Sequence, residues 1–148
     1  METVPEKLDI ELKEALKNRE ELKLSTLRMI KASLKNKEIE KMTPLSGDDI
    51  ITVLSTLSKQ RRESIEQYIA ASRPDLAEKE EKELNIIQGF LPKQLSPDEL
   101  DALITDAIRE SGASSPSEAG KVMKILSPKT KGVADGKTVN NRVKELLS

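Results

Sequence analysis

The segment "FLPKQLSPDEL", residues 90–100, decides how the helices of this chain are divided. Pro92 ends any helix that reaches it from the amino-terminal side, because proline lacks a backbone N–H and its ring clashes with the preceding turn. Ser96 then supplies a hydroxyl N-cap, Pro97 suits the first helical position, and Glu99 completes a capping box. The segment therefore predicts the end of one helix, a short hinge and the start of another helix.

The same start signals recur on both sides of this segment. Thr3 and Ser115 each stand three residues before a glutamate, which is the spacing of a capping box, and Ser46 precedes acidic residues that suit a helix amino terminus. Between these signals Leu, Ile and Ala recur at helical spacing. Pro128 is expected to end the sixth helix. The predicted helices cover residues 5–18, 21–41, 47–72, 75–90, 97–111, 116–127 and 136–147.

These helices predict an all-α fold in two parts, without a strand. An N-terminal bundle of about four helices occupies residues 1–94, a small three-helix domain occupies residues 95–148, and a hinge lies at residues 92–96. The apolar positions expected to face the core from the first and third helices are Leu8, Leu12, Ala15, Leu16, Ile50, Leu54, Leu57, Ile65 and Ile69.

The composition excludes several kinds of active site. The 148 residues include no cysteine and no histidine, so disulfides, thiolate nucleophiles and imidazole bases are ruled out. The 26 acidic side chains show no recognisable catalytic or metal-binding constellation. We therefore expect a protein without catalytic residues, metal or cofactor.

Hydropathy gives an expectation for the compartment. No apolar run approaches the roughly 18 residues of a membrane span. Residues 1–20 carry acids throughout and lack the apolar block of a secretory signal. The predicted location is cytoplasmic, with no membrane partner.

Charge is distributed unevenly along a chain whose net charge is -1. Residues 95–119 carry one basic and six acidic side chains, whereas residues 120–148 carry seven basic and two acidic ones. The basic residues of this end are Lys121, Lys124, Lys129, Lys131, Lys137, Arg142 and Lys144. Such a patch binds phosphate backbones through counterion release. The patch has no aromatic residue, which favours folded RNA over stacked single strands, and a merely solvated face remains the alternative.

The stretch "GVADGKT" (132–138) resembles a phosphate-binding loop but is one residue short of G-x-x-x-x-G-K-[ST]. A true loop also needs a buried strand before it, and here the preceding segment is predicted to be helical. The better interpretation is that Gly132 turns the chain and Asp135 caps the last helix. Lys137 then lies in the first helical turn, which is unfavourable beside the helix dipole and weakly suggests that it faces an anion.

Two further basic groups lie in the predicted bundle. One comprises Lys59, Arg61, Arg62 and Arg73. Its spacing to Glu63 and Glu66 favours ion pairs within one helix. The other comprises Arg28, Lys31 and Lys35. This second group has no equally convenient acids and could extend an anion-binding surface.

Three stretches closely resemble the YqeY-like proteins, small bacterial relatives of the tail region of the GatB component of aspartyl/glutamyl-tRNA amidotransferase. They are "STLRMIKASLKNKEI" (25–39), "LSKQRRESIEQYIAASRPDLAEKEEKELNIIQGFLPKQLSPDEL" (57–100) and "GASSPSEAGKVMKILSPKTKGVADGKTVNNRVKELLS" (112–148). The resemblance runs essentially end to end. It implies an all-helical fold with a small tail domain that contacts the body of a tRNA.

The resemblance and the charge pattern together give the candidate RNA-binding residues. Those that match the family motif or the adjoining helix are Gly120, Lys121, Lys124, Lys131, Gly132, Lys137 and Asn140, and the charge pattern adds Lys129 and Arg142. Val133 stands where the family often has lysine, which slightly weakens the electrostatic inference. The chain is too short for the amidase component or the ATP-using module, so an association with carbon–nitrogen ligase activity holds only by homology.

The sequence thus predicts an accessory, non-catalytic protein that binds tRNA or another folded RNA through its lysine-rich C-terminal end. The alternative is a protein-interaction adaptor without RNA affinity, docked on an amidotransferase or an aminoacyl-tRNA synthetase. Steep salt dependence of binding would separate the first from the second.

Overall fold

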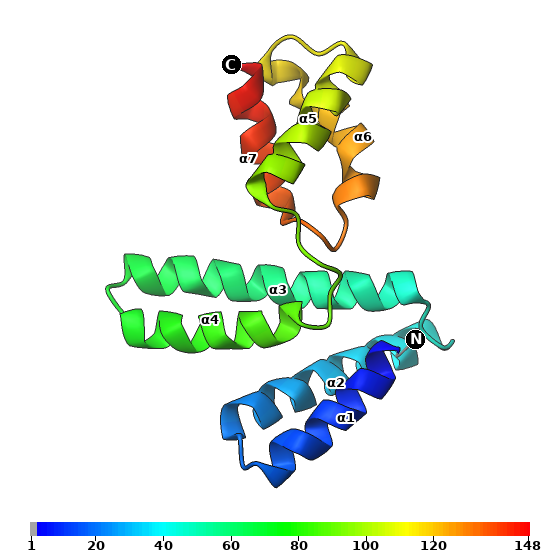
Figure 1. The fold of residues 1–148 in the computed structure, drawn as a ribbon, viewed down its shortest axis with the longest axis vertical. Coiled ribbons are helices and arrows are strands. Elements are labelled where there is room, and N and C mark those ends of the chain that lie inside the picture. The colour runs from blue at the N-terminus through cyan, green and yellow to red at the C-terminus, as the bar shows by residue number, and fades with distance from the viewer. Residues whose placement is uncertain (1–2) are drawn as a thin grey trace. The chain divides into compact units, whose positions relative to one another are not determined.

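The computed structural model describes residues 3–148, and these residues form seven α-helices and one 3-10 turn (Figure 1). The helices are α1 (Val4–Lys17), α2 (Glu21–Lys41), α3 (Gly47–Ala70), α4 (Pro74–Gln88), α5 (Pro97–Ser111), α6 (Ala119–Thr130) and α7 (Gly136–Leu147), with the turn η1 at Pro116–Glu118. The described part of the chain contains no strand. The all-α prediction is therefore confirmed.

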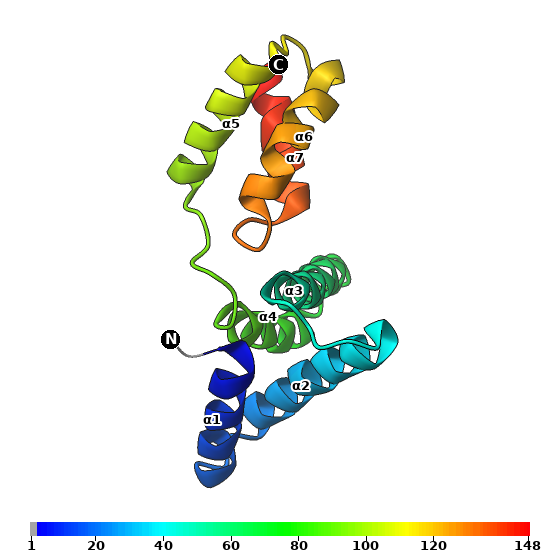
Figure 2. The same ribbon diagram turned by 90° about the vertical axis from the view of Figure 1, so that its right-hand side faces the viewer.

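The chain divides into two compact units, the first ending at Pro92 and the second beginning at Lys93. In the first unit, α1 and α2 form one helical hairpin, and α3 and α4 run side by side as another (Figure 1). In the second unit, α5, α6 and α7 pack together (Figure 2). Each unit has its own apolar core.

Side-chain caps fix where several helices begin. The hydroxyls of Thr3, Ser46 and Ser96 each accept a hydrogen bond from the backbone N–H three residues later, and the acidic side chain at that position bonds back to the cap. Each capping box satisfies two backbone donors that a helix amino terminus otherwise leaves without partners. The capping boxes predicted at Thr3 and Ser96 are confirmed.

The core of the first unit is built from the predicted helical stripes, with two corrections. Leu8, Leu27 and Leu54 are almost completely buried. Leu16 and Ile69, which were expected to face the core, are 60% and 63% exposed. Both lie in the last turn of their helices, α1 and α3, where the core no longer covers them.

Several ion pairs of the first unit join residues on different helices, which spacing along the sequence does not predict. Arg61 belongs to a basic group in which the sequence offered intrahelical acids only to Lys59 and Arg62. Its Nε lies 2.7 Å from Glu83 and 3.4 Å from Glu80, both on α4. Lys31, assigned to a stripe without convenient acids, lies 3.1 Å from Asp9 of α1. Spacing along one helix does not reveal acids supplied by a neighbouring helix, so the expectation that Lys31 lacks a nearby acid was wrong, and the acids that pair with Arg61 were not foreseen.

The second unit has a core made by one face of each helix. The residues buried there are Leu100, Ile104 and Ala107 of α5, Ala119, Val122 and Leu126 of α6, and Val139, Val143 and Leu147 of α7. These positions recur every three or four residues, so each helix keeps its remaining faces for solvent. The basic side chains of α6 and α7 are carried on those remaining faces.

Two local predictions for α6 are wrong. Ser115 makes no capping hydrogen bond to the following helix, and the segment after it is a 3-10 turn. Pro128 lies inside α6, which continues to Thr130. Pro128 cannot donate a hydrogen bond to the preceding turn, and the helix ends two residues later at Thr130. Within the described residues, no helix is sufficiently long and apolar to cross a membrane.

Candidate functional site

The candidate site is the basic surface of the second unit, carried by α6, the α6–α7 loop and α7. On α6, Lys121 and Lys124 are exposed, while Val122 and Leu126 are completely buried. Because the two lysines are three residues apart, they lie on the same face of the helix, opposite the buried residues. Gly120 is exposed between them and the turn η1, and a Cβ at that position would meet no atom within 4 Å.

The α6–α7 loop is held by the segment that precedes α5. Gln94 donates from Nε2 to the carbonyl oxygen of Gly132 at 2.8 Å, and the N–H of Leu95 donates to the carbonyl oxygen of Val133 at 2.8 Å. Gly132 is buried and has a φ of 79°, a left-handed conformation that favours glycine. The predicted chain-turning role of Gly132 is confirmed. Gln94, by contrast, was assigned to a free hinge, and its role in holding this loop was missed.

The stretch that resembles a phosphate-binding loop forms a helix cap, in which the carboxylate of Asp135 is the acceptor. Its Oδ2 accepts hydrogen bonds from the N–H and the hydroxyl of Thr138, at 3.3 and 3.0 Å. Asp135 therefore caps α7 as predicted, and the hydroxyl that a phosphate loop would present to a metal is already bonded to the cap. The segment before the loop is α6, not a strand.

Arg142 does not lie free on the basic surface. Its Nε and one terminal nitrogen bond to the two carboxylate oxygens of Asp101, each at 2.8 Å, and the other terminal nitrogen bonds to Glu145 at 2.8 Å. These hydrogen bonds raise the pKa of Arg142 above its usual range and lower the pKa of Asp101. Arg142 thus joins α7 to α5, and it is a poor candidate for phosphate binding.

The other basic residues of α7 lie on the side of the helix away from the Arg142–Asp101 ion pair. Lys137 and Lys144 are seven residues apart and are both exposed, so they share one flank of the helix. Arg142 occupies the opposite flank, which faces α5 through Asp101. The two lysines are therefore turned away from the acidic helix, with half-buried Asn140 on their side.

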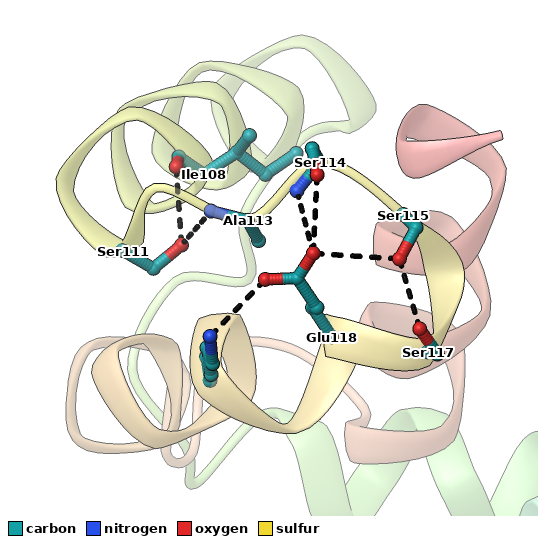
Figure 3. A network of polar contacts seen from close by, with 8 residues as sticks. Ile108, Ser111, Ala113, Ser114, Ser115, Ser117 and Glu118 are labelled. Atoms are coloured by element: carbon teal, nitrogen blue, oxygen red, sulfur yellow. Dashed lines mark hydrogen bonds and ion pairs between the residues drawn. The ribbon is translucent and has the colours of Figure 1, made fainter.

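Glu118 organises the turn before α6 (Figure 3). Its carboxylate also accepts a hydrogen bond from Lys121. One carboxylate oxygen accepts from the N–H and hydroxyl of Ser114 at 3.3 and 3.1 Å and from the hydroxyl of Ser115 at 3.4 Å. The other oxygen lies 3.1 Å from Lys121 Nζ. The bond from Lys121 is the main cause of a lowered pKa at Glu118, followed by the bonds from Ser114. The i, i+3 spacing of Glu118 and Lys121 was a signal that could have revealed this pair.

The other lysines of the surface differ in their surroundings. Lys124 and Lys129 form no ion pair within the part of the chain that the structure describes. Lys131 and Lys137 take part in polar or electrostatic contacts. The sequence-predicted residues are thus gathered on one unit, with Lys124 and Lys129 the members most available to an outside anion.

The opposite helix of the unit is acidic. Asp98, Asp106 and Glu110 are exposed on α5, and this helix has Arg109 as its counter-charge, 3.6 Å from Asp106. Among residues 3–148, no three acidic side chains come together in an arrangement suited to a metal ion. The second unit therefore carries its acidic side chains mainly on α5 and its basic side chains mainly on α6, the α6–α7 loop and α7.

Comparison with known proteins identifies the family. The sequence matches the family described as "Yqey-like protein" over residues 5–147. This chain belongs to that family. The resemblance stated from the sequence motifs is therefore confirmed.

Relatives of the chain are known from fungi. A protein of Vanderwaltozyma polyspora described as "Altered inheritance of mitochondria protein 41, mitochondrial" is 38% identical over 97 residues, which are 64% of this chain and 52% of the relative. Proteins with the same description from Lachancea thermotolerans and Pyrenophora tritici-repentis are 34% and 29% identical, over 72% and 95% of this chain and 59% and 79% of their own lengths. The chain spans about half the length of the first of these relatives.

The names of these relatives overturn one prediction. All three are described as mitochondrial, which contradicts the cytoplasmic location expected from the sequence. That expectation rested on charge and hydropathy, and a charged helical surface suits any aqueous compartment. Composition alone therefore could not decide the location.

Proposed function

We propose that this YqeY-family chain is a non-catalytic accessory protein that binds tRNA or another folded RNA. The second unit docks on RNA phosphates through the basic surface, defined as Lys121, Lys124, Lys129, Lys131 and Lys137. The family relationship to the tail of a tRNA-dependent amidotransferase motivates the choice of tRNA.

The observation that carries the proposal is the charge separation within the second unit. Lys124 and Lys129 project from α6 without an ion-pair partner among residues 3–148, while the acids of the unit lie mainly on α5. A ligand with many negative charges would meet α6 and α7 and be repelled from α5. RNA is such a ligand, and its binding releases condensed counterions.

The shape and composition of the surface favour folded RNA. Residues 93–148 contain no Phe, Tyr or Trp, so no ring is present on which single-stranded bases could stack. Lysines on helix faces contact phosphates without reading bases, which suits recognition of the RNA by its backbone and shape.

The test is a titration of the intact protein against labelled tRNA, with unlabelled tRNA and a single-stranded oligonucleotide of the same length as competitors. The expected result is displacement by tRNA at a concentration at least tenfold lower than by the single strand. Replacing Lys121, Lys124 and Lys131 by glutamate is expected to weaken binding by at least about a hundredfold at low salt.

A matched control comes from the first unit. Lys13, Lys17 and Lys79 are exposed, and their replacement by glutamate changes the net charge by the same amount. The proposal requires this variant to keep most of its RNA affinity. Equal loss in both triple variants would show that only net charge matters, and absence of binding by the parent at low salt would direct attention to a protein partner instead.

A further inference from the structure

The first unit contains an apolar groove that the RNA proposal does not use. The start of α1, the connection between α2 and α3, the first turn of α3 and the segment that follows α4 line an open space of about 640 Å³. Its apolar walls include Val4, Leu45, Ile50, Ile51, Phe90 and Leu91. This volume lies within the range of about 300–1,000 Å³ typical of small-molecule sites.

Lys7 is the charged side chain of this groove. Among the lining residues that the structure describes, it alone carries a formal charge. Its ammonium group donates a hydrogen bond to the carbonyl oxygen of Gly89 and lies 4.9 Å from the centroid of the Phe90 ring. These contacts hold a cation at the groove while the side chain stays 41% exposed.

The acids near Lys7 do not cancel its charge. Glu11 approaches Lys7 at 4.0 Å, but it also lies 3.5 Å from Lys23, so two ammonium groups share one carboxylate. Glu6, one residue before Lys7, is engaged in the capping box with Thr3. The cluster of Lys7, Glu11 and Lys23 therefore keeps a surplus of one positive charge.

We propose that this groove binds a small amphiphile with one negative charge, such as a carboxylate on an aliphatic chain. The aliphatic chain lies against Ile50, Ile51 and Leu91, and the carboxylate pairs with Lys7. Burial of apolar surface supplies most of the affinity, and the cation fixes the orientation and selects the sign of the headgroup. This site is in the first unit and is independent of RNA binding by the second.

The charge complementarity separates this ligand from others. A cationic amphiphile would place like charges together at Lys7, which costs affinity. A neutral amphiphile would use the same apolar walls without the ion pair. A fully hydrophilic anion such as acetate would form the ion pair with Lys7 but bury no aliphatic chain against the apolar walls. Only an anionic amphiphile uses both features of the groove.

The experiment is calorimetric titration of the full chain with laurate below its micellar concentration. Dodecyltrimethylammonium, dodecyl maltoside and acetate serve as the cationic, neutral and hydrophilic comparisons. The expected result is saturable binding of one laurate per chain, at least tenfold tighter than the cationic amphiphile, with no detectable binding of acetate. Absence of saturable laurate binding, or equal affinity for both signs of headgroup, would overturn the proposal.

Variants locate the site. Lys7→Met keeps an aliphatic side chain and is expected to weaken laurate binding about three- to tenfold while leaving dodecyl maltoside binding unchanged. Lys13→Met removes an exposed charge from the same helix, outside the groove, and should leave both affinities unchanged. Because dodecyl maltoside reports whether the walls are intact, a damaged groove is distinguishable from a lost ion pair. Unchanged laurate affinity in Lys7→Met would contradict the assignment.

Discussion

The two units of this chain use their charged residues in different ways. In the first unit, basic and acidic side chains from different helices pair, as in Lys31 with Asp9 and Arg61 with Glu80 and Glu83. In the second, the acids lie mainly on α5 and the bases on α6 and α7, and Arg142 joins the two sides through Asp101.

This difference indicates different roles for the two surfaces. Pairing between helices leaves little net field, although each exposed pair contributes only about 0–1 kcal/mol to stability. Separation of charge within one small unit creates a directional field that attracts a polyanion to one side. The second unit is therefore the better place to look for RNA binding, and its acidic helix should oppose binding there.

The largest effect is expected from a substitution that leaves a cavity in the core of the second unit. Leu126→Ala removes a completely buried side chain and should cost about 2–5 kcal/mol of unfolding free energy. That is most of the stability expected of so small a unit, so RNA affinity should be largely lost at physiological temperature. Chemical denaturation followed by circular dichroism, together with tRNA titration, measures both effects.

Ile30→Ala is the counterpart in the first unit, where Ile30 is also completely buried. It should destabilise that unit by a comparable amount and leave RNA affinity within about twofold. If Ile30→Ala abolished RNA binding as completely as Leu126→Ala, the first unit would be part of the interface and the contrast between the units would fail.

An intermediate effect is expected when the acid that holds Arg142 is neutralised. Asp101→Asn removes a negative charge from the second unit and breaks the bidentate pair, so the melting temperature should fall slightly. RNA affinity should rise about two- to threefold at low salt, because repulsion is reduced and Arg142 gains freedom. Filter binding to tRNA measures the change.

Asp9→Asn is the matched control, because Asp9 pairs with Lys31 in the first unit. Its RNA affinity should equal that of the parent. A rise as large as that of Asp101→Asn would mean that any lost acid strengthens binding, and that the position of the acid within the charge separation is irrelevant.

The smallest effect concerns the pH dependence of a pair in the first unit. The side chain of Lys41, 2.7 Å away, and the N–H of Ser46 lower the pKa of Asp49 from 3.8 to about 2. A carboxylate with a depressed folded-state pKa stabilises the protein above its unfolded pKa and loses that contribution as pH falls through the folded value. The stabilisation should therefore be complete above about pH 4 and disappear toward pH 2.

Thermal unfolding of Asp49→Asn beside the parent checks this expectation. The difference in melting temperature should be constant above about pH 4 and shrink as the pH approaches 2. Lys41→Met removes the main cause of the shift and should move the loss of stability to higher pH. A difference that stayed the same down to the lowest pH would rule out ionisation of Asp49 as its source.

The sequence predicted features that depend on neighbouring residues. The capping boxes at Thr3 and Ser96 follow from hydroxyl and glutamate side chains three residues apart, and the cap of Asp135 follows from its place before α7. Periodic Leu, Ile and Val residues predicted the helices because burial of one face stabilises them. Both partners of each cap lie within one helical turn, so a short stretch of sequence is sufficient to predict it.

Features that join distant segments were not predicted. Asp101 and Arg142 are 41 positions apart, and Gln94 and Gly132 are 38 apart. No spacing rule relates such residues, because their contact depends on how the helices pack. The same limit explains Arg61, whose acidic partners come from α4. The groove beside Lys7 was missed for this reason too, since its walls come from separate segments of the first unit.

The most direct test of the account is the slope of log K against log salt concentration for tRNA binding. The measurement compares the parent with the variant in which Lys121, Lys124 and Lys131 are glutamate and with the control variant at Lys13, Lys17 and Lys79. We predict a steep negative slope for the parent and the control, and loss of about one unit of slope for each lysine removed from the basic surface. The same slope in all three proteins, or binding that does not respond to salt, would contradict RNA docking by the second unit.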